Sequence, residues 1–286
     1  MFNKIVHASD GSKYAFEALI LALAIARQNN SELHIVCVEE IPYVPEFIAE
    51  VEATAPVAQK IQEIFQRARA IAQEQNVTLH THAVAGHPVR TVVKLAADLN
   101  ADLLVIGARG HSALYERMVG SKAHRIVHLA PCPVLVVKLP VEKSDNSAFK
   151  RILHANDGSK YGVHALTVAL GLAQQNNAEL HMVCVEEIPY LSESVDESRE
   201  MAAIVARRIE GVFQRARARA EEYRITLYTH LLKGHPVKTI VQLAGDLNVD
   251  LLIVGVRGHS ALYVRMIGSH ADRIMQLAPC PVLVAK

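Results

Sequence analysis

Residues 7–14 read His-Ala-Ser-Asp-Gly-Ser-Lys-Tyr, and residues 154–161 read His-Ala-Asn-Asp-Gly-Ser-Lys-Tyr. The similarity continues to the end of the chain, because most positions of 102–138 are identical in 250–286. Self-similarity over segments this long indicates two copies of one domain rather than a short solenoid repeat. The architecture of one copy therefore decides that of the other.

The length of the chain agrees with this division, since 286 residues are about twice the usual domain length of roughly 150. We predict a first domain at residues 1–138 and a second at 150–286. Residues 139–149 between them include a proline, two serines, an aspartate and an asparagine, which is typical of a polar linker.

The composition is that of an ordinary folded protein, with 51 % apolar and 21 % charged residues. A net charge of +1 gives no electrostatic reason to expect nucleic acid or an anionic membrane as partner. No apolar stretch approaches the roughly 20 residues that span a bilayer. The four cysteines form no C-x-x-C pair, so we expect buried, reduced and inert thiols in a cytoplasmic protein.

Strand-like and helix-like segments alternate within the first copy. Short runs rich in Val, Ile and Leu predict strands at 4–8, 33–38, 78–84, 103–106 and 134–137. Apolar residues at helical spacing predict helices at 14–29, 57–72 and 88–99. This alternation predicts an α/β fold in which each half is a doubly wound parallel sheet with helices on both faces. Such sheets bind ligands at the carboxyl ends of their strands.

A glycine-rich loop follows the fourth predicted strand. It reads Gly107-Ala-Arg-Gly110-His111-Ser112 and is followed by Gly120-Ser121 at the start of a helix; the second half repeats it at 255–260 and 268–269. Glycines let backbone amides approach an anion, and the first turn of a helix adds unpaired amides with a favourable dipole. The alternative is that the glycines only turn the chain and Ser121 only caps a helix.

The spacing G-x2-G-x9-G-[ST] after an apolar strand resembles the nucleotide loop of the universal stress protein family. The Asp-Gly-Ser after the first strand, Gly86-His87-Pro88 and the terminal Ala-Pro-Cys-Pro are also similar to that family, and the resemblance covers nearly the whole chain twice. It implies a five-stranded sheet of order 3-2-1-4-5 in each half and membership of the ATP-binding branch.

The same resemblance, together with polar residues that adjoin the loop, gives a set of candidate nucleotide-binding residues in each half. These are Ala8, Ser9, Asp10, Val38, Gly107, Arg109, Gly110, His111, Gly120, Ser121 and Lys122, and then Ala155, Asn156, Asp157, Val185, Gly255, Arg257, Gly258, His259, Gly268, Ser269 and His270. Relatives often carry a small or branched apolar residue where this chain has Lys122 and His270. Together with the exchange of Ser9 for Asn156, this departure leaves equal affinity of the halves open.

We expect an adenine-nucleotide sensor or adaptor that binds ATP, or AMP or ADP, with Mg²⁺ as an open addition. The P-loop, the dinucleotide fingerprint and the nucleophile elbow are absent from the sequence, so we expect no catalytic residues. Slow ATP hydrolysis or autophosphorylation, with Ser112, Ser121 or their repeats in the second half as acceptors, is one alternative. An oligomerising scaffold that binds no nucleotide is the other.

Fifteen histidines raise the question of a metal site. His80 and His82 share one side of a strand, and His124 and His128 share one side of a helix, so either pair has the spacing of metal ligands. The second copy has Tyr228 in place of His80 and replaces both helical histidines. We therefore expect structural or solvent-facing histidines and no metal.

The fifth predicted strands, 134–137 and 282–285, are apolar and would be hazardous as open sheet edges. Family dimers associate through this strand, so the resemblance implies an internal pseudo-dimer; dimerisation of whole chains stays an open alternative. The segment 39–56 is longer than most connections and differs between the halves, which suits contact with an unknown protein partner or with the nucleotide.

Overall fold

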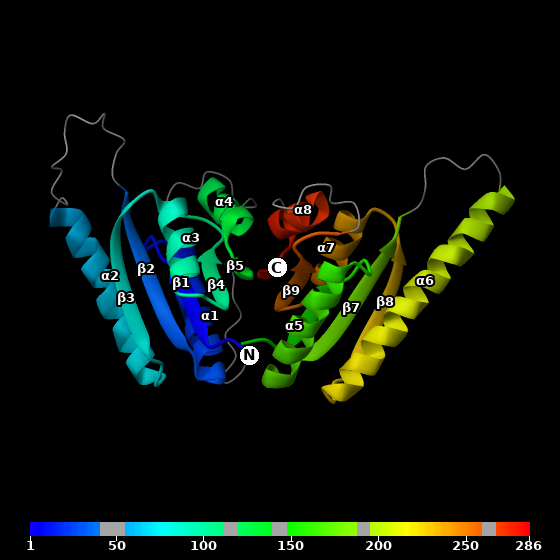
Figure 1. Ribbon diagram of the computed structural model, residues 1–286, viewed down its shortest axis with the longest axis horizontal. Coiled ribbons are helices and arrows are strands. Elements are labelled where there is room, and N and C mark those ends of the chain that lie inside the picture. Colours follow the sequence, from blue (N-terminus) through cyan, green and yellow to red (C-terminus); the bar gives the residue numbers. More distant parts are fainter. Residues whose placement is uncertain (41–54, 111–118, 139–147, 188–194, 259–266) are drawn as a thin grey trace. The chain divides into compact units, whose positions relative to one another are not determined.

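The computed structural model describes residues 1–40, 55–110, 119–138, 148–187, 195–258 and 267–286. The chain divides into two compact units, Met1–Val141 and Glu142–Lys286. Strands and helices alternate along each unit (Figure 1). This is the alternation that the sequence predicts for a doubly wound α/β domain.

The elements of the two units correspond one to one. The first unit contains β1 (Lys4–Ala8), α1 (Lys13–Asn29), β2 (Glu32–Glu40), α2 (Ala55–Glu74), β3 (Leu79–Gly86), α3 (Pro88–Asp98), β4 (Leu103–Gly107), α4 (Ser121–Leu129) and β5 (Val134–Val137). The second contains β6 (Arg151–Ala155), α5 (Lys160–Asn176), β7 (Glu179–Glu186), α6 (Val195–Glu222), β8 (Leu227–Lys233), α7 (Pro236–Asp246), β9 (Leu251–Gly255), α8 (Ser269–Leu277) and β10 (Val282–Ala285).

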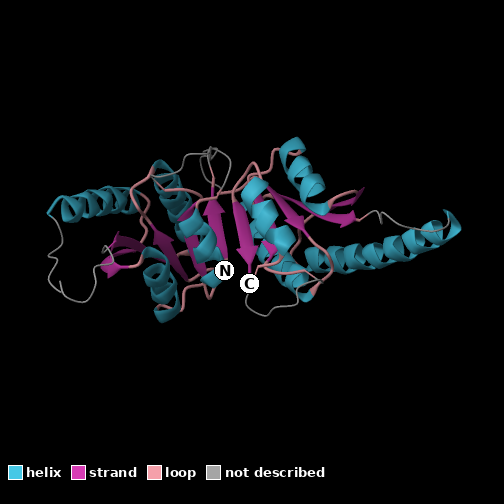
Figure 2. Cartoon of the chain, turned by 90° about the horizontal axis from the view of Figure 1, so that it is seen from above, coloured by secondary structure: helices cyan, strands magenta, loops and turns pink. Residues whose placement is uncertain are grey.

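The strands of the first unit lie in the order β3-β2-β1-β4-β5, and those of the second in the order β8-β7-β6-β9-β10. Neighbouring strands within each unit pair in parallel. Helices lie on both faces of each sheet (Figure 2). The predicted fold class and the strand order 3-2-1-4-5 are confirmed.

The central strands carry the core because both of their faces are covered. All four residues of β5 and the three middle residues of β1 are buried. Near-continuous apolar sequence is what such doubly covered parallel strands require. Phe2 and Phe149, at corresponding places before β1 and β6, are also buried.

The first helix of each unit begins and ends at residues suited to those positions. The Ser12 hydroxyl accepts a hydrogen bond from the Ala15 amide at 3.2 Å, and Asn30 ends α1 in the left-handed conformation with φ 53°. Ser159 and Asn177 repeat both features around α5. A capping serine satisfies a first-turn amide that the helix itself leaves unpaired. Both helices therefore hold the turn after β1 or β6 in a fixed place.

Most of the segment 39–56, expected to cover the nucleotide or contact a partner, lies outside the described residues. Pairing of the fifth strands with each other stays a prediction. No helix in the described ranges is long and apolar enough to cross a membrane. All four cysteines are buried and none forms a disulfide, as the sequence predicts.

Candidate nucleotide site

A pocket of about 360 Å³ lies at the carboxyl ends of β1, β2 and β4 in the first unit, where the first turn of α4 closes it. It is lined by Ala8, Ser9, Asp10, Ala15, Val36, Val38, Glu40, Pro88, Ile106, Gly107, Arg109, Gly110, Gly120, Ser121, Lys122, Ala123 and Ile126. This volume lies within the range of about 300–1,000 Å³ typical of small-molecule sites.

The second unit holds a corresponding pocket of about 350 Å³ at the ends of β6, β7 and β9. It is lined by Ala155, Asn156, Asp157, Gly162, Val183, Val185, Glu187, Pro236, Ile240, Val254, Gly255, Arg257, Gly258, Gly268, Ser269, His270, Ala271 and Ile274. Every candidate site residue from the sequence that the structure describes lies on one of the two pockets. His111 and His259 fall outside the described residues, as does Ser112.

The structure adds lining residues that the sequence reasoning did not select. Val36 joins Val38 on one face of β2, Pro88 comes from the start of α3, and Ile126 comes from α4. The alternation of side chains along a strand could have revealed Val36, since residues two apart share a face. Pro88 and Ile126 carry no chemical signature, and only the packing of their helices places them.

Asp10 stands in a tight turn between β1 and α1. Its Oδ1 accepts the Ser12 amide at 2.9 Å, and Gly11 between them has φ +78°, a conformation that favours glycine. The other carboxylate oxygen, Oδ2, occupies the space that a Cβ at Gly110 would need. The side chain of Asp10 is exposed, so its carboxylate faces the pocket at the end of β1.

The glycines of the loop divide into two groups by their surroundings. A Cβ at Gly107 would lie 2.8 Å from the Tyr14 carbonyl carbon, so backbone packing explains this glycine, whereas a Cβ at Gly110 would meet the carboxylate of the exposed Asp10 side chain. A Cβ at Gly120 would have ordinary contacts at 3.6 Å. Packing therefore leaves room for a side chain at Gly120, and its absence keeps the mouth of the pocket clear beside the start of α4.

The start of α4 presents unpaired amides to the pocket. Gly120 is the N-cap residue and offers no side-chain cap. Ser121, Lys122 and Ala123 follow it and line the pocket, and their amides have no intrahelical partner. Unpaired amides and the helix dipole favour an anion at this place. Gly268 and Ser269 begin α8 in the same way.

Arg109 is held by the protein itself. Its Nη1 donates to the Tyr14 hydroxyl at 2.9 Å, and its guanidinium lies 5.3 Å from the centre of the Tyr14 ring. Arg257 makes the same bond to Tyr161 at 3.0 Å. Arg109 is 8 % exposed, so its charge is fixed at the rim of the pocket rather than free in solvent.

Buried groups lie behind the pocket wall. Burial lowers the pKa of His7 to about 4, although a bond to the Val105 carbonyl and the charge of Asp10 oppose this effect. Burial likewise raises the pKa of Cys37 to about 12, and Asp10 adds to that rise. Both groups are uncharged near neutral pH, so neither adds a charge behind the pocket wall.

The second pocket accommodates its larger Asn156 through a compensating change. The Asn156 Oδ1 accepts the Gly158 amide at 2.7 Å, where Ser9 Oγ accepts the Gly11 amide at 3.3 Å in the first unit. A Cβ at Gly162 would lie 2.5 Å from Asn156 Oδ1, and the first unit has Ala15 at that place. The change from Ser9 to Asn156 is thus accompanied by the change from Ala15 to Gly162, and the turn keeps its shape.

The rims of the pockets differ in charge. The Nζ of Lys122 lies 2.7 Å from Glu40 Oε2, and both side chains are exposed. In the second unit the corresponding residues are His270 and Glu187, which both line the pocket. The neighbouring Glu186 is buried and its carboxylate lies 3.5 Å from Lys233 Nζ. Besides the arginine that both pockets have, the first pocket therefore has a lysine at its rim where the second has an imidazole.

A family model, the universal stress protein family, matches residues 1–138 and again residues 148–286. The chain belongs to the universal stress protein family. Its tandem architecture is thereby shown, and the resemblance found in the sequence is confirmed.

Relatives of this universal stress protein agree with the match to each half. Universal stress protein MJ0531 of Methanocaldococcus jannaschii is 33 % identical over 148 residues, which are 49 % of this chain and 84 % of the relative. Universal stress protein YxiE of Bacillus subtilis is 35 % identical over 149 residues, which are 48 % of this chain and the whole of the relative.

A crystal structure of a universal stress protein from Archaeoglobus fulgidus matches the fold of the full chain. It has a TM-score of 0.71 and 22 % identity, and the match covers 99 % of this chain and 96 % of that one. At this identity the likeness shows the shared fold.

Proposed function

We propose that each half of this universal stress protein binds an adenine nucleotide, with ATP as the first candidate, and that occupancy alters a surface recognised by a protein partner. The observation that carries the proposal is the repeated pocket in which unpaired amides of α4 or α8 face a space left clear by Gly120 or Gly268. Such a helix start suits phosphate.

The remaining parts of the pocket suit the rest of a nucleotide. Val36 and Val38 give an apolar wall for a base, and Ile126 adds to the apolar lining from α4. The exposed Asp10 carboxylate can accept hydrogen bonds from ribose hydroxyls or an exocyclic amine. Lys122 can contribute to phosphate binding once it leaves Glu40. Mg²⁺ would enter with the phosphates of ATP, and the Asp10 carboxylate adjoins Gly110 of the glycine loop.

Two other functions remain as alternatives. Slow ATP hydrolysis or autophosphorylation predicts ADP or phosphoserine at Ser121 or Ser269 during prolonged incubation, and neither product would appear with a pure binder. A nucleotide-free scaffold predicts no nucleotide on the purified protein and no heat on titration. We infer a cytoplasmic protein, because four free buried thiols suit a reducing compartment.

Isothermal titration with ATP, AMP and cyclic AMP tests the proposal, using Ser121→Glu and Ser269→Glu separately and together. Both serines are exposed first residues of helices, where a glutamate favours the helix dipole by about 0.3–1 kcal/mol. The same carboxylate about 5 Å from a bound phosphate charge costs about 3 kcal/mol, or more than about 100-fold in affinity. Each glutamate variant should thus keep or slightly raise its folding stability while its nucleotide affinity falls.

Wild type should show two sites, each single variant one and the double variant none. Ser121→Gln has the same side-chain length without the charge and should keep the first site. Weak binding of AMP and cyclic AMP beside tight binding of ATP would assign the helix start to the outer phosphates. Two undiminished sites in the double variant, or no binding by wild type, would refute the proposal and direct the search to protein partners.

A further inference from the structure

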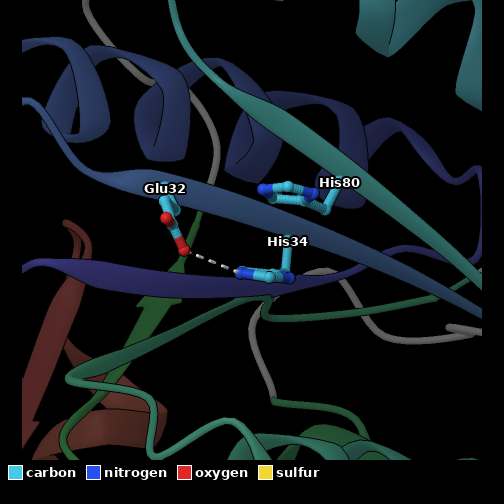
Figure 3. Close-up of side chains that lie close together, drawn as sticks. All are labelled: Glu32, His34 and His80. Atoms are coloured by element: carbon cyan, nitrogen blue, oxygen red, sulfur yellow. Dashed lines mark ion pairs between the residues drawn. The ribbon is translucent and has the colours of Figure 1, made fainter.

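Three side chains gather at the start of β2 and β3 in the first unit. Glu32 and His34 come from β2, and His80 lies opposite His34 in the register of β3. The His80 ring stacks over the His34 ring with centroids 4.6 Å apart, and Glu32 reaches toward the same side (Figure 3). One potential ligand atom of each residue lies within 4.8 Å of the other two.

His34 gives this cluster a buried polar atom that the described part of the chain does not satisfy. His34 is 6 % exposed, and its Nε2 is buried without a hydrogen-bond partner. Glu32 Oε2 lies 3.7 Å from this nitrogen, beyond hydrogen-bond distance (Figure 3). A buried nitrogen without a partner costs free energy, so its place beside the Glu32 carboxylate and under the His80 ring requires an explanation.

The other nitrogen of His34 is already held. Its Nδ1 lies 3.0 Å from His82 Nε2, a hydrogen bond in which one ring donates and the other accepts. When Nδ1 donates, Nε2 carries a free lone pair directed at Glu32. A hydrogen bond to the far nitrogen is how proteins commonly fix a metal-binding histidine, so His82 positions His34 without being a ligand.

We propose that Glu32, His34 and His80 form a binding site for a divalent transition-metal ion of the zinc type. Imidazole nitrogen and carboxylate oxygen are the donors such ions take, at about 2.0–2.2 Å. Glu32 and His80 are exposed and can close around an ion, whereas His34 is fixed. With three protein ligands, water completes a tetrahedral site.

The protonation state of His34 agrees with this role. Burial, together with His80 and His82, lowers its pKa to about 4, so the ring is neutral at physiological pH. Lys4, opposite Glu32 in register, adds to the same effect. Within the described residues the Glu32 carboxylate lies 3.7 Å from the neutral His34 ring and forms no ion pair with Lys4, which leaves it available to a cation.

The site is separate from the nucleotide pocket. Every second residue of β2 lies on the same face of the sheet, so Glu32 and His34 share a face with Val36 and Val38. Of these four, Val36 and Val38 line the pocket. At about 3.3 Å per residue, four residues place His34 roughly 13 Å from Val38. A metal here would join β2 to β3 at the amino ends of the strands, and its presence does not depend on the proposed function.

The second unit supplies an internal control. Glu179, His181 and His230 repeat the geometry, with the same 3.7 Å and 3.0 Å distances, and His181 Nε2 is likewise buried and unsatisfied in the described residues. Tyr228 replaces the third ligand and stacks on His181 at 5.0 Å. Arg151 Nε donates to Glu179 at 2.7 Å and so competes for the carboxylate. We therefore assign the site to the first unit alone.

The test is a titration of metal-free, untagged full-length protein with ZnCl₂ by calorimetry, with zinc content measured after dialysis. His80→Tyr is the matched variant, because the chain itself accommodates tyrosine at the corresponding place in the second unit. It should weaken zinc binding by more than about 100-fold, since losing a residue that only orients a ligand already costs about 10–100-fold. Circular dichroism and thermal unfolding without metal check that the variant keeps its fold.

The reciprocal change is Arg151→Lys with Tyr228→His, which should create a second zinc site. Wild type should bind one tight zinc, His80→Tyr none and the reciprocal variant two. Zinc should also raise the unfolding temperature of wild type but not of His80→Tyr, because only a metal held by the folded state stabilises it. No tight zinc in wild type, unchanged affinity in His80→Tyr, or no added site in the reciprocal variant would overturn the proposal.

Discussion

Replacing His7 by asparagine removes a titratable group from the centre of the first unit. His7 is fully buried, and its Nδ1 lies 3.1 Å from the Val105 carbonyl oxygen. Asparagine can place its amide nitrogen near the same carbonyl, so the variant keeps the donor and loses the ionisation. His154 occupies the equivalent place in the second unit, between the carbonyls of Ile253 and Gly162.

The expected effect follows from the pKa of His7, about 4 in the folded protein against 6.5 for an ordinary histidine. Between these values the unfolded chain binds a proton that the folded chain does not, so stability falls as the pH falls. The full difference between the two pKa values corresponds to about 3 kcal/mol of unfolding free energy. At pH about 5, some 2 kcal/mol of it is already lost, and His154, whose pKa is also about 4, contributes similarly.

Urea unfolding at pH 7.5 and 5.0, followed by circular dichroism, measures this loss. His7→Asn should be less stable than wild type at pH 7.5 because it leaves a small cavity, yet lose about 2 kcal/mol less on acidification. His164→Gln, at an exposed histidine of α5, should retain the wild-type loss. An NMR titration with His7 ionising near 6.5, or an equal acid loss in His7→Asn, would refute the reasoning.

Two further predictions concern packing and thiol reactivity. Gly107→Ala should lower the unfolding free energy by about 1–3 kcal/mol, because its Cβ meets the backbone of Tyr14. Gly245→Ala in α7, where a Cβ has nothing within 4 Å, should raise it by about 0.5 kcal/mol. Equal shifts in the unfolding temperatures of the two variants would contradict this. Cys37 and Cys184, each with a pKa raised to about 12 by burial, should resist iodoacetamide at pH 8 until urea unfolds the chain; rapid labelling of the folded protein would contradict this.

The sequence predicts the elements well where apolar periodicity reports burial, and less well where backbone pairing extends past the apolar residues. The helix expected at 14–29 is α1 from Lys13 to Asn29, because Ser12 caps it. The strand expected at 33–38 is β2 from Glu32 to Glu40. Its polar ends pair with neighbouring strands although they add nothing to a hydrophobic run, and side-chain pattern alone does not show such pairing.

The candidate site was predictable to the extent that its residues follow strand ends. Asp10, Gly107 and Gly110 are far apart in sequence, yet a parallel sheet brings the carboxyl ends of adjacent strands to one edge. Packing against the Tyr14 backbone accounts for Gly107 within the protein, and the sequence left such a structural role open beside ligand binding. Ile126 and Pro88 could not be found without the packing of α4 and α3, because apolar residues are common everywhere.

The histidine cluster shows a different limit. Sequence spacing compared His80 with His82 on one strand, whereas the structure brings His80 to His34, which is 46 positions earlier and on the neighbouring strand. Register between strands is set by the whole sheet and is invisible in local spacing. Compared by position along the chain alone, the exchange of His80 for Tyr228 argues against a metal; with the register known, it argues for a difference between the halves.

Under the proposed function, the two pockets should differ in nucleotide affinity according to how free the Lys122 charge is. Lys122 pairs with Glu40 at 2.7 Å, but both side chains are more than half exposed, and exposed pairs contribute only about 0–1 kcal/mol. A bound phosphate can therefore draw Lys122 away from Glu40 at little cost, while His270 offers a full charge only when protonated. Because the two pockets have nearly equal volumes, we expect their nucleotide affinities to differ through charge rather than through space. The preference of the first pocket should be strongest for the most highly charged nucleotide and should weaken as added salt screens the lysine.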